Sequence, residues 1–204
     1  MTTGTRERRT AEDRAVERIV LRTFATVTGR DGEPLRWTLL PDTPVGTLGL
    51  AAGPAGLCRL DFVKGEEQFV GRMLEAFGDR PLLRTPAALD GVRRQLDRYF
   101  AGRRLTFDLD VDLSAVSGFS LRVLQCAARI PPGEVLTYTE IAAKAGNSRA
   151  SRAAGNALHN NPVAIVVPCH RILRSDGSLG GYGGGLDRKE WLLEHEGARA
   201  AELG

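Results

Sequence analysis

The chain places a thiol, an imidazole and a guanidinium next to one another at Cys169, His170 and Arg171. An apolar run at residues 163–167 leads into this group. The thiolate, rather than the thiol, is the nucleophile, and a neighbouring base or cation lowers a cysteine pKa from its usual value of about 8.5. The alternative is that Cys169 is a small hydrophobic residue at the end of a buried strand. Neighbours in sequence need not touch in the fold, so the Cys-His pair alone leaves both interpretations open.

Six short motifs surround this group in a fixed order, and together they resemble the C-terminal domain of the O6-alkylguanine-DNA alkyltransferases, the methylated-DNA–protein-cysteine methyltransferases. Each motif alone is weak, but the ordered set is specific and spans residues 119–197. The motifs are Pro-Gly-Glu-Val-Leu-Thr-Tyr at 132–138, Arg-Ala-Ala-Gly at 152–155, Asn-Pro at 161–162, Pro-Cys-His-Arg at 168–171, Gly-Tyr-Gly-Gly-Gly at 181–185 and Lys-Glu-Trp-Leu-Leu at 189–193.

The resemblance implies direct repair of DNA with no cofactor and no metal. An alkyl group leaves O6 of guanine, or O4 of thymine, and stays on Cys169 as a thioether, so that each molecule reacts once. His170 is implied to accept the thiol proton through a water, while Glu190 orients the imidazole and stabilises its positive form. Asn161 is implied to hydrogen-bond the turn that presents the thiol. Taken alone, Glu190 would be an exposed helical glutamate and Asn161 part of an ordinary Asn-Pro turn.

The resemblance also implies that the base is turned out of the duplex before it reacts, because O6 inside the duplex cannot reach a buried thiol. Arg152 is implied to enter from the minor groove and fill the gap that the base leaves. The residues implied to contact the base are Tyr138, Leu158, Ile172, Tyr182 and Gly183. Those implied to contact the DNA backbone are Thr139, Asn147, Ser175 and Ser120.

Two positions differ from many relatives. Gly183 stands where many have serine, which removes a hydroxyl but keeps a backbone N–H for the base. Ala164 stands where some relatives have proline, and the change is expected to admit larger alkyl groups.

The elements that must position these residues are predicted to be mostly helical. Pro131 ends the first of them, because proline cannot continue the helical hydrogen-bond ladder. Thr137 and Glu140 have the spacing of a capping box at the start of the second. Gly146 separates the second from the third, which makes a helix-turn-helix, a DNA-docking unit in many proteins and a neutral packing motif in others. The three helices are predicted at residues 119–130, 138–145 and 148–159.

The first half of the chain shows a different pattern. Short apolar runs divided by turn residues predict strands at 35–40, 47–51 and 57–63, helical spacing follows at 66–77 and 87–100, and 107–113 reads as a strand or an extended linker. The fold is therefore predicted to be α+β. By the resemblance, residues 35–116 form a small N-terminal ribonuclease-H-like α/β domain of structural role, and residues 117–204 form the DNA-binding and alkyl-acceptor domain. Residues 1–34 read as a basic extension with a helix near residues 15–24.

Composition indicates a globular protein. Hydrophobic residues make up 42% of the 204 residues, and no apolar stretch approaches the roughly 20 residues needed to cross a bilayer. The charged N-terminus is unlike a signal peptide, and three scattered cysteines argue against a disulfide framework, so we expect a cytoplasmic protein. We also expect it to be monomeric in solution. All three histidines lie in the last quarter of the chain, so no Cys/His zinc site is expected in the N-terminal half.

Residues 144–174 carry five Lys and Arg and no Asp or Glu, and they enclose Cys169. A basic stretch is usually solvated surface, but one around a candidate nucleophile favours the binding of a polyanion such as double-stranded DNA.

Three functions fit parts of this pattern. A self-inactivating alkyltransferase needs Cys169, Arg152 and Tyr138, and all three are present. A lesion-binding sensor of the same fold without efficient transfer has no need of the cysteine. A thiol hydrolase would use Cys169 and His170 and would leave the DNA-facing helix unexplained. The sequence favours the alkyltransferase.

Overall fold

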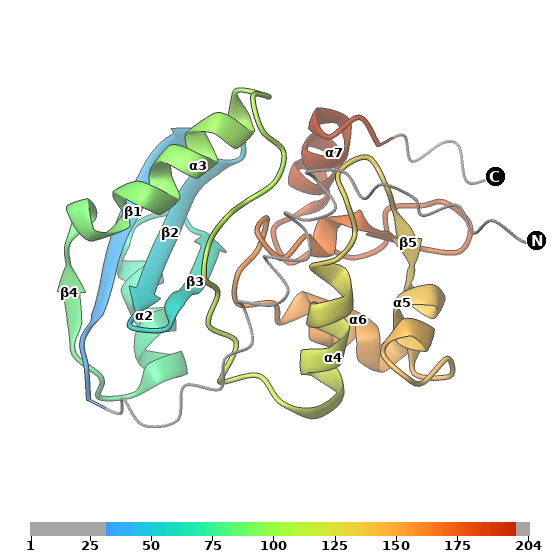
Figure 1. Cartoon of the computed structure of the whole chain (residues 1–204), viewed down its shortest axis with the longest axis horizontal. Helices are drawn as coiled ribbons and strands as arrows, with labels where there is room; N and C mark the ends of the chain where they lie inside the picture. The colour runs from blue at the N-terminus through green and yellow to red at the C-terminus, as the bar shows by residue number, and fades with distance from the viewer. Residues whose placement is uncertain (1–31, 199–204) are drawn as a thin grey trace, which may run out of the picture.

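The computed structural model describes residues 32–198, and the helix predicted near residues 15–24 lies outside this range. Figure 1 shows a sheet flanked by helices and, beside it, a group of shorter helices. No helix within the described range is long and apolar enough to cross a membrane.

A four-stranded mixed sheet forms the N-terminal part, in the order β3-β2-β1-β4. The first three strands pair antiparallel in sequence order, and β4 runs parallel to β1. The three predicted strands are confirmed, whereas the three-residue β4 is too short to produce a recognisable pattern. The strands are β1 Leu35–Thr43, β2 Gly46–Gly53, β3 Gly56–Phe62 and β4 Leu82–Arg84.

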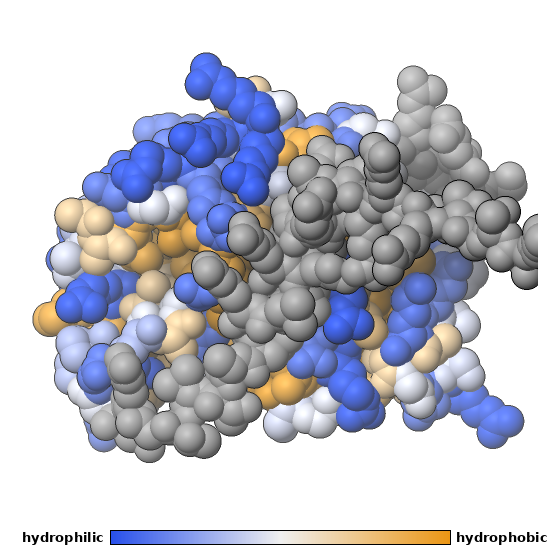
Figure 2. Space-filling model, in the orientation of Figure 1, coloured by the Kyte–Doolittle hydropathy of each residue, from blue (hydrophilic) through white to orange (hydrophobic). Residues whose placement is uncertain are grey.

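Two helices cover opposite faces of this sheet, α2 (Glu66–Phe77) behind it and α3 (Asp90–Phe100) in front (Figure 1). Successive side chains of a strand point to opposite faces. Accordingly Leu50 of β2 packs in the cluster that contains α3, whereas its neighbour Ala51 packs in the cluster that contains α2. In the same view, Figure 2 shows hydrophilic side chains along the outer side of α3 and apolar ones below it, where the helix meets the sheet. The predicted helix at 87–100 is confirmed from Asp90 onward, after a 3-10 turn, η1, at Pro86–Leu89.

The C-terminal part is mostly helical, as predicted. The capping box of Thr137 and Glu140 is present at the start of α5. The helix α6 begins three residues later than predicted, because Asn147 stabilises a turn instead: its side chain accepts from Arg149 N at 3.1 Å and its carbonyl from Ala150 N at 3.0 Å. The elements are α4 Gly118–Ala127, β5 Leu136–Thr137, α5 Tyr138–Lys144, α6 Ser151–His159, η2 Cys169–Arg171, β6 Ile172–Leu173 and α7 Leu186–His195.

One hydrophobic core joins the two parts. A single cluster of buried side chains includes Leu50 of β2, Leu96 of α3, Val123 of α4 and Leu192 of α7. The sheet therefore supports the helices directly.

The extended segment between the two parts lies against β3. Leu57 N donates to Asp110 O at 2.8 Å, and Asp112 N donates to Leu57 O at 2.9 Å. The approach requires Gly56, because a Cβ there would lie 2.3 Å from Asp110 O. The segment 107–113 thus contributes one β-bridge, at Val111, to the edge of the sheet.

Candidate active site

The segment that delivers Cys169 is attached to β3, at the edge of the sheet. Leu60 N donates to Pro162 O at 2.8 Å, and Ala164 N donates to Leu60 O at 3.1 Å. Every residue from 163 to 170 is buried. Within the segment Ile165 has φ of 68°, a left-handed conformation that is rare for a β-branched side chain and persists only where the surrounding structure holds it. The position of the thiol therefore depends on the N-terminal sheet.

Asn161 closes the turn in front of the thiol with all of its polar atoms. Its Nδ2 donates to Val167 O at 2.8 Å and to Cys169 Sγ at 3.1 Å, and its Oδ1 accepts from Val163 N at 3.1 Å. The structure places Asn161 at the turn, where the sequence puts it, and adds a direct contact with the sulfur.

A two-stranded parallel sheet, which the sequence did not indicate, relates Tyr138 to Cys169. Leu136 of β5 pairs with Ile172 of β6, and Thr137 pairs with Leu173. Because β5 runs directly into Tyr138 and β6 directly follows the turn of Cys169, the pairing brings the first residue of α5 to the thiol.

His170 is fully buried, and its Nε2 lies 3.0 Å from Glu196 Oε1. Arg171 donates to the same carboxylate, from Nε to Oε2 at 2.6 Å and from Nη2 to Oε1 at 2.7 Å. A third donor comes from the N-terminal part, where the hydroxyl of Tyr99 lies 2.7 Å from Oε1. These four residues form a buried cluster behind the thiol.

The protonation of this cluster follows from Glu196. Burial alone would raise the pKa of its carboxyl, but hydrogen bonds from Arg171 and His170 outweigh burial and lower the pKa to about 2. An ionised carboxylate only accepts hydrogen bonds, so the proton of neutral His170 is on Nε2 and Nδ1 is an acceptor. Burial lowers the pKa of the ring, so His170 is neutral at rest. Its Nδ1 has no hydrogen-bond partner among the described protein atoms, so this atom is available to accept a proton.

The prediction that Glu190 orients His170 is wrong. Glu190 is exposed on α7, and the carboxylate on His170 belongs to Glu196, just beyond the end of that helix. Helical spacing gives the reason, because the buried stripe of α7 runs through Lys189, Leu192 and Leu193 at offsets of three and four residues and continues to Glu196. One residue away from Lys189, Glu190 points to solvent.

Lys189 is a second member of this site that the sequence motifs did not single out. It is fully buried, and its Nζ donates to the carbonyls of Ile172 and Leu179 and lies 5.9 Å from the ring centre of Tyr138. Burial lowers its pKa to about 8, against the opposing effect of Cys169. A lysine in line with Leu192 and Leu193 on the buried side of a helix is the signal that would have identified it.

Opposing effects act on the pKa of the Cys169 thiol. Burial raises its pKa, while the hydrogen bond from Asn161 and the charge of Lys189 lower it, and burial wins. The hydroxyl of Tyr182 also lowers it, although it makes no hydrogen bond of good geometry in the described structure. The resting form of Cys169 is therefore the thiol.

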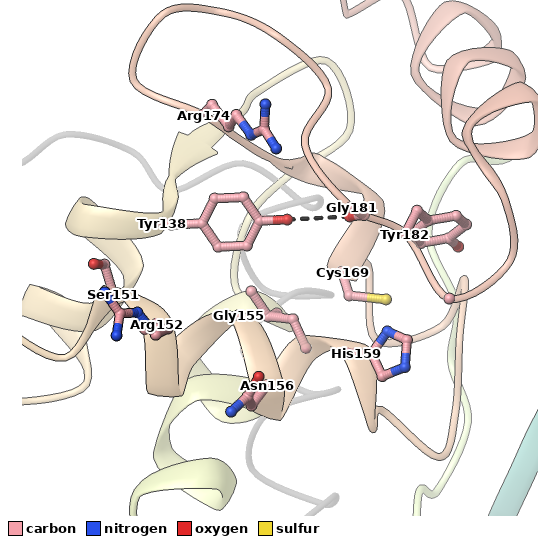
Figure 3. A pocket seen from close by; sticks show the side chains of 12 residues that line it. Tyr138, Ser151, Arg152, Gly155, Asn156, His159, Cys169, Arg174, Gly181 and Tyr182 are labelled. Carbon is pink, nitrogen blue, oxygen red and sulfur yellow. Dashed lines mark hydrogen bonds between the residues drawn. The ribbon is translucent and has the colours of Figure 1, made fainter.

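A cavity of about 610 Å³ opens over Cys169, a size typical of small-molecule sites. Figure 3 shows Tyr138 and Tyr182 on either side of it and the sulfur between Tyr182 and His159. The Tyr138 hydroxyl donates to Gly181 O at 3.1 Å. The lining residues are Tyr138, Ser151, Arg152, Gly155, Asn156, Leu158, His159, Cys169, Arg174, Gly181, Tyr182 and Gly183.

Four of the five predicted base contacts line this cavity: Tyr138, Leu158, Tyr182 and Gly183. The fifth, Ile172, is fully buried and does not, and its carbonyl accepts from Lys189. Arg152, exposed on α6, lies at the rim (Figure 3). Four residues were predicted to contact the DNA backbone. Of these, Thr139, Asn147 and Ser175 are exposed and Ser120 is half-buried.

A second cavity, of about 370 Å³, shares Cys169 and Tyr182 with the first. Its other wall comes from the N-terminal part, with Arg59, Asp61 and Phe62 of β3. Ala164 lines it too, so the position that differs from some relatives faces space beside the thiol.

Two family models match the chain. The ribonuclease-like domain of 6-O-methylguanine DNA methyltransferase matches residues 35–113, and the DNA binding domain of the same family matches residues 118–198. A methylated-DNA–protein-cysteine methyltransferase of Methanosarcina barkeri is 40% identical over 155 residues, which cover 76% of this chain and 93% of the relative. The protein of the same name from Mycobacterium tuberculosis is 41% identical over 162 residues, covering 78% and 91%.

Solved structures show the same similarity. The crystal structure of Mycobacterium tuberculosis O6-methylguanine methyltransferase matches with a TM-score of 0.68 and 36% identity, over 82% of this chain and 96% of that one. A structure described as Mycobacterium tuberculosis OGT in complex with DNA matches with a TM-score of 0.68 and 36% identity, over 83% and 98%.

Proposed function

The chain belongs to the O6-methylguanine DNA methyltransferase family, and we propose that the sulfur of Cys169 accepts the alkyl group in its reaction, activated by His170 and Glu196. The family and the α+β fold expected from the sequence are thereby confirmed. The activity is that of a methylated-DNA–protein-cysteine methyltransferase (EC 2.1.1.63), a protein that binds and repairs alkylated DNA. The observation that carries the proposal is the position of the Cys169 sulfur at the wall of a cavity whose rim holds Arg152 and Tyr138.

The proposed step moves one proton and one alkyl group. His170 takes the proton of Cys169 on Nδ1, directly or through one water, and the ionised Glu196 stabilises the resulting imidazolium through Nε2. The thiolate attacks the alkyl carbon, the bond from that carbon to O6 of guanine breaks, and its electron pair leaves with the base, which takes up the released proton. The thioether is stable and no described group beside Cys169 is suited to cleave it, so one molecule repairs one lesion.

Lys189 supports this step from the other side of the thiol. Its charge favours the thiolate, and its bonds to the carbonyls of Ile172 and Leu179 hold the strand after Cys169 to the loop that leads into the cavity wall.

DNA is proposed to bind over α5 and α6 through its minor groove, with the reacting base turned out into the cavity. The small residues of α6 support this proposal because they would allow close approach, and so does the exposed Arg152 at the rim of the cavity, which we propose fills the gap in the duplex. Thr139, Asn147, Ser175 and Ser120 are proposed to bind phosphates. We further propose that the protein acts as a monomer in the cytoplasm, a compartment in which the three cysteines, all free in the structure, stay reduced.

Intact-mass measurement tests the proposal. After mixing with a duplex that contains O6-methylguanine, the protein should gain one methyl group, on the peptide that contains Cys169, and Cys169→Ser should gain none. Binding of the duplex without a mass gain would instead support the lesion sensor. Continued repair by a limiting amount of protein would contradict the single reaction per molecule.

A further inference from the structure

The first turn of α7 carries an arginine in an unfavourable place. Arg188 is the third residue of the helix, and a cation near a helix N-terminus is repelled by the helix dipole. None of the ion pairs found among residues 32–198 includes Arg188. Another interaction must account for its position.

The guanidinium instead joins two backbone segments from the two parts of the molecule. Its Nε donates to Val45 O at 2.6 Å, in the turn between β1 and β2, and its Nη1 donates to Gly184 O at 2.6 Å. Gly184 belongs to the glycine-rich segment 181–185, which supplies Gly181, Tyr182 and Gly183 to the wall of the cavity over Cys169.

Phe62 of β3 completes this contact. The guanidinium carbon of Arg188 lies 5.1 Å from the centre of the Phe62 ring, and that ring meets Tyr182 edge-on with centres 5.9 Å apart. The packing is tight enough to require a glycine, because a Cβ on Gly184 would lie 2.6 Å from Phe62 and 2.8 Å from Tyr182.

We infer that Arg188 is a positioning residue for base recognition: it clamps the glycine-rich segment 181–185 to the β1–β2 turn, so that the N-terminal part sets the position of Tyr182 and Gly183 against the base. A fork of two N–H donors at fixed geometry is what arginine provides and lysine does not. The inference rests on the proposed function, in which Tyr182 and Gly183 contact the base.

Such a clamp affects the recognition of the base and not the chemistry of the thiol. Arg188 contacts neither Cys169 nor the cluster of His170 and Glu196, and it reaches the thiol only through Tyr182, whose effect on the thiol pKa is the smallest of those that lower it. Its loss should therefore change the reactivity of the thiol little. Its loss should slow only those reactions in which the cavity wall must hold a base.

The experiment compares rates of alkylation of Cys169 by three reagents: O6-methylguanine in a duplex, free O6-benzylguanine, and iodoacetamide, which needs no base recognition. In both Arg188→Gln and Arg188→Lys, the two base substrates should react about tenfold or more slowly, because neither side chain restores the fork, while iodoacetamide reacts within about twofold of wild type. Amide hydrogen exchange at residues 181–185 should become faster. Arg84→Gln is the matched control, since Arg84 also lies over an aromatic ring, that of Trp37, and pairs with Glu66 far from the cavity.

The outcomes are distinguishable. If wild type fails to transfer a methyl group from the duplex, the proposed function is wrong whatever Arg188 does. If wild type reacts and Arg188→Lys matches it, or if all three reagents slow equally, the clamp is wrong. Phe62→Leu, which removes the ring but leaves every hydrogen bond in place, should slow the base substrates selectively as well, and it provides the test should the Arg188 variants not fold.

Discussion

Tyr99 of α3 donates its hydroxyl to Glu196 Oε1 at 2.7 Å, so a residue from the N-terminal part completes the cluster that holds His170. Burial and the adjacent carboxylate raise the pKa of Tyr99, so the hydroxyl stays protonated and remains a donor. The carbonyl of the same residue accepts from His195 Nε2 at 2.6 Å. Through these two bonds α3 holds the end of α7 in place behind the thiol.

Tyr99→Phe tests this connection. The change keeps the ring but removes one donor to a buried charged group, so the free energy of unfolding should fall by about 1–3 kcal/mol. Urea unfolding at neutral pH measures it. Transfer should slow only a few-fold, because Arg171 still holds the carboxylate with two bonds. An unchanged unfolding midpoint would show that the Tyr99 hydroxyl has no energetic role.

Glu196→Gln should raise the apparent pKa of the Cys169 thiol, because an amide cannot stabilise the imidazolium of His170 as a carboxylate does. A rise of about one pKa unit would slow transfer about tenfold at pH 7, and the rate should partly recover in alkali. The pH profile of transfer measures both effects. Glu190→Gln, on the exposed side of α7, is the matched control and should keep the wild-type profile. A shift in that variant would mean that Glu190, and not Glu196, orients His170.

Glu196 should also make the fold sensitive to acid. Its pKa in the folded protein is about 2, below the ordinary value of 4.5, so the unfolded chain binds more protons between these values. The resulting stabilisation, about 3 kcal/mol, is complete above pH 4.5 and is lost as the pH falls toward 2. Urea unfolding across this range should show a steeper loss in wild type than in Glu196→Gln. Parallel curves would mean that the carboxyl is not held ionised by its partners.

Arg152→Ala should slow transfer from duplex DNA about a hundredfold, because turning out a base costs a few kcal/mol that Arg152 offsets. Free O6-benzylguanine, which is already outside a duplex, should react at nearly the wild-type rate. Arg149→Ala, an exposed arginine that does not line the cavity, controls for the loss of a positive charge. Equal losses on both substrates would assign Arg152 to the structure of α6 rather than to the duplex.

The cavity beside Ala164 should accept alkyl groups larger than methyl. Filling it with Ala164→Leu is expected to slow transfer of a benzyl group from duplex O6-benzylguanine about tenfold while changing methyl transfer much less. Leucine is a better probe here than proline, because the backbone N–H of Ala164 is needed for its bond to Leu60 O. Ala164→Ser, which is close in size, is the control. Equal slowing of both groups would show that the alkyl chain does not enter this cavity.

The sequence predicted the residues that lie close to one another along the chain better than those that meet only in the fold. Local motifs identified Cys169, Asn161 and Tyr138, and the structure brings them to one site. The assignment of Glu190 failed because it followed a motif instead of the helical spacing that leads from Lys189 to Glu196. Tyr99 could not have been found in this way, since it lies 97 residues before its partner and no local pattern records the contact.

Short elements also escaped prediction. β5 and β6 have two residues each, which is too few to show a period, yet their pairing brings Tyr138 beside the thiol. Arg188 likewise looks like an ordinary surface cation until the β1–β2 turn and the glycine-rich segment are seen on either side of it.

The burial of Cys169 affects how long an unreacted molecule lasts. Its side chain is almost entirely enclosed, and burial raises the pKa of the thiol, so the idle protein presents little thiolate to electrophiles in solution. Because each molecule reacts only once, alkylation or oxidation of Cys169 by any other reagent inactivates it. The low reactivity of the unbound thiol thus keeps each molecule active until it binds a damaged base.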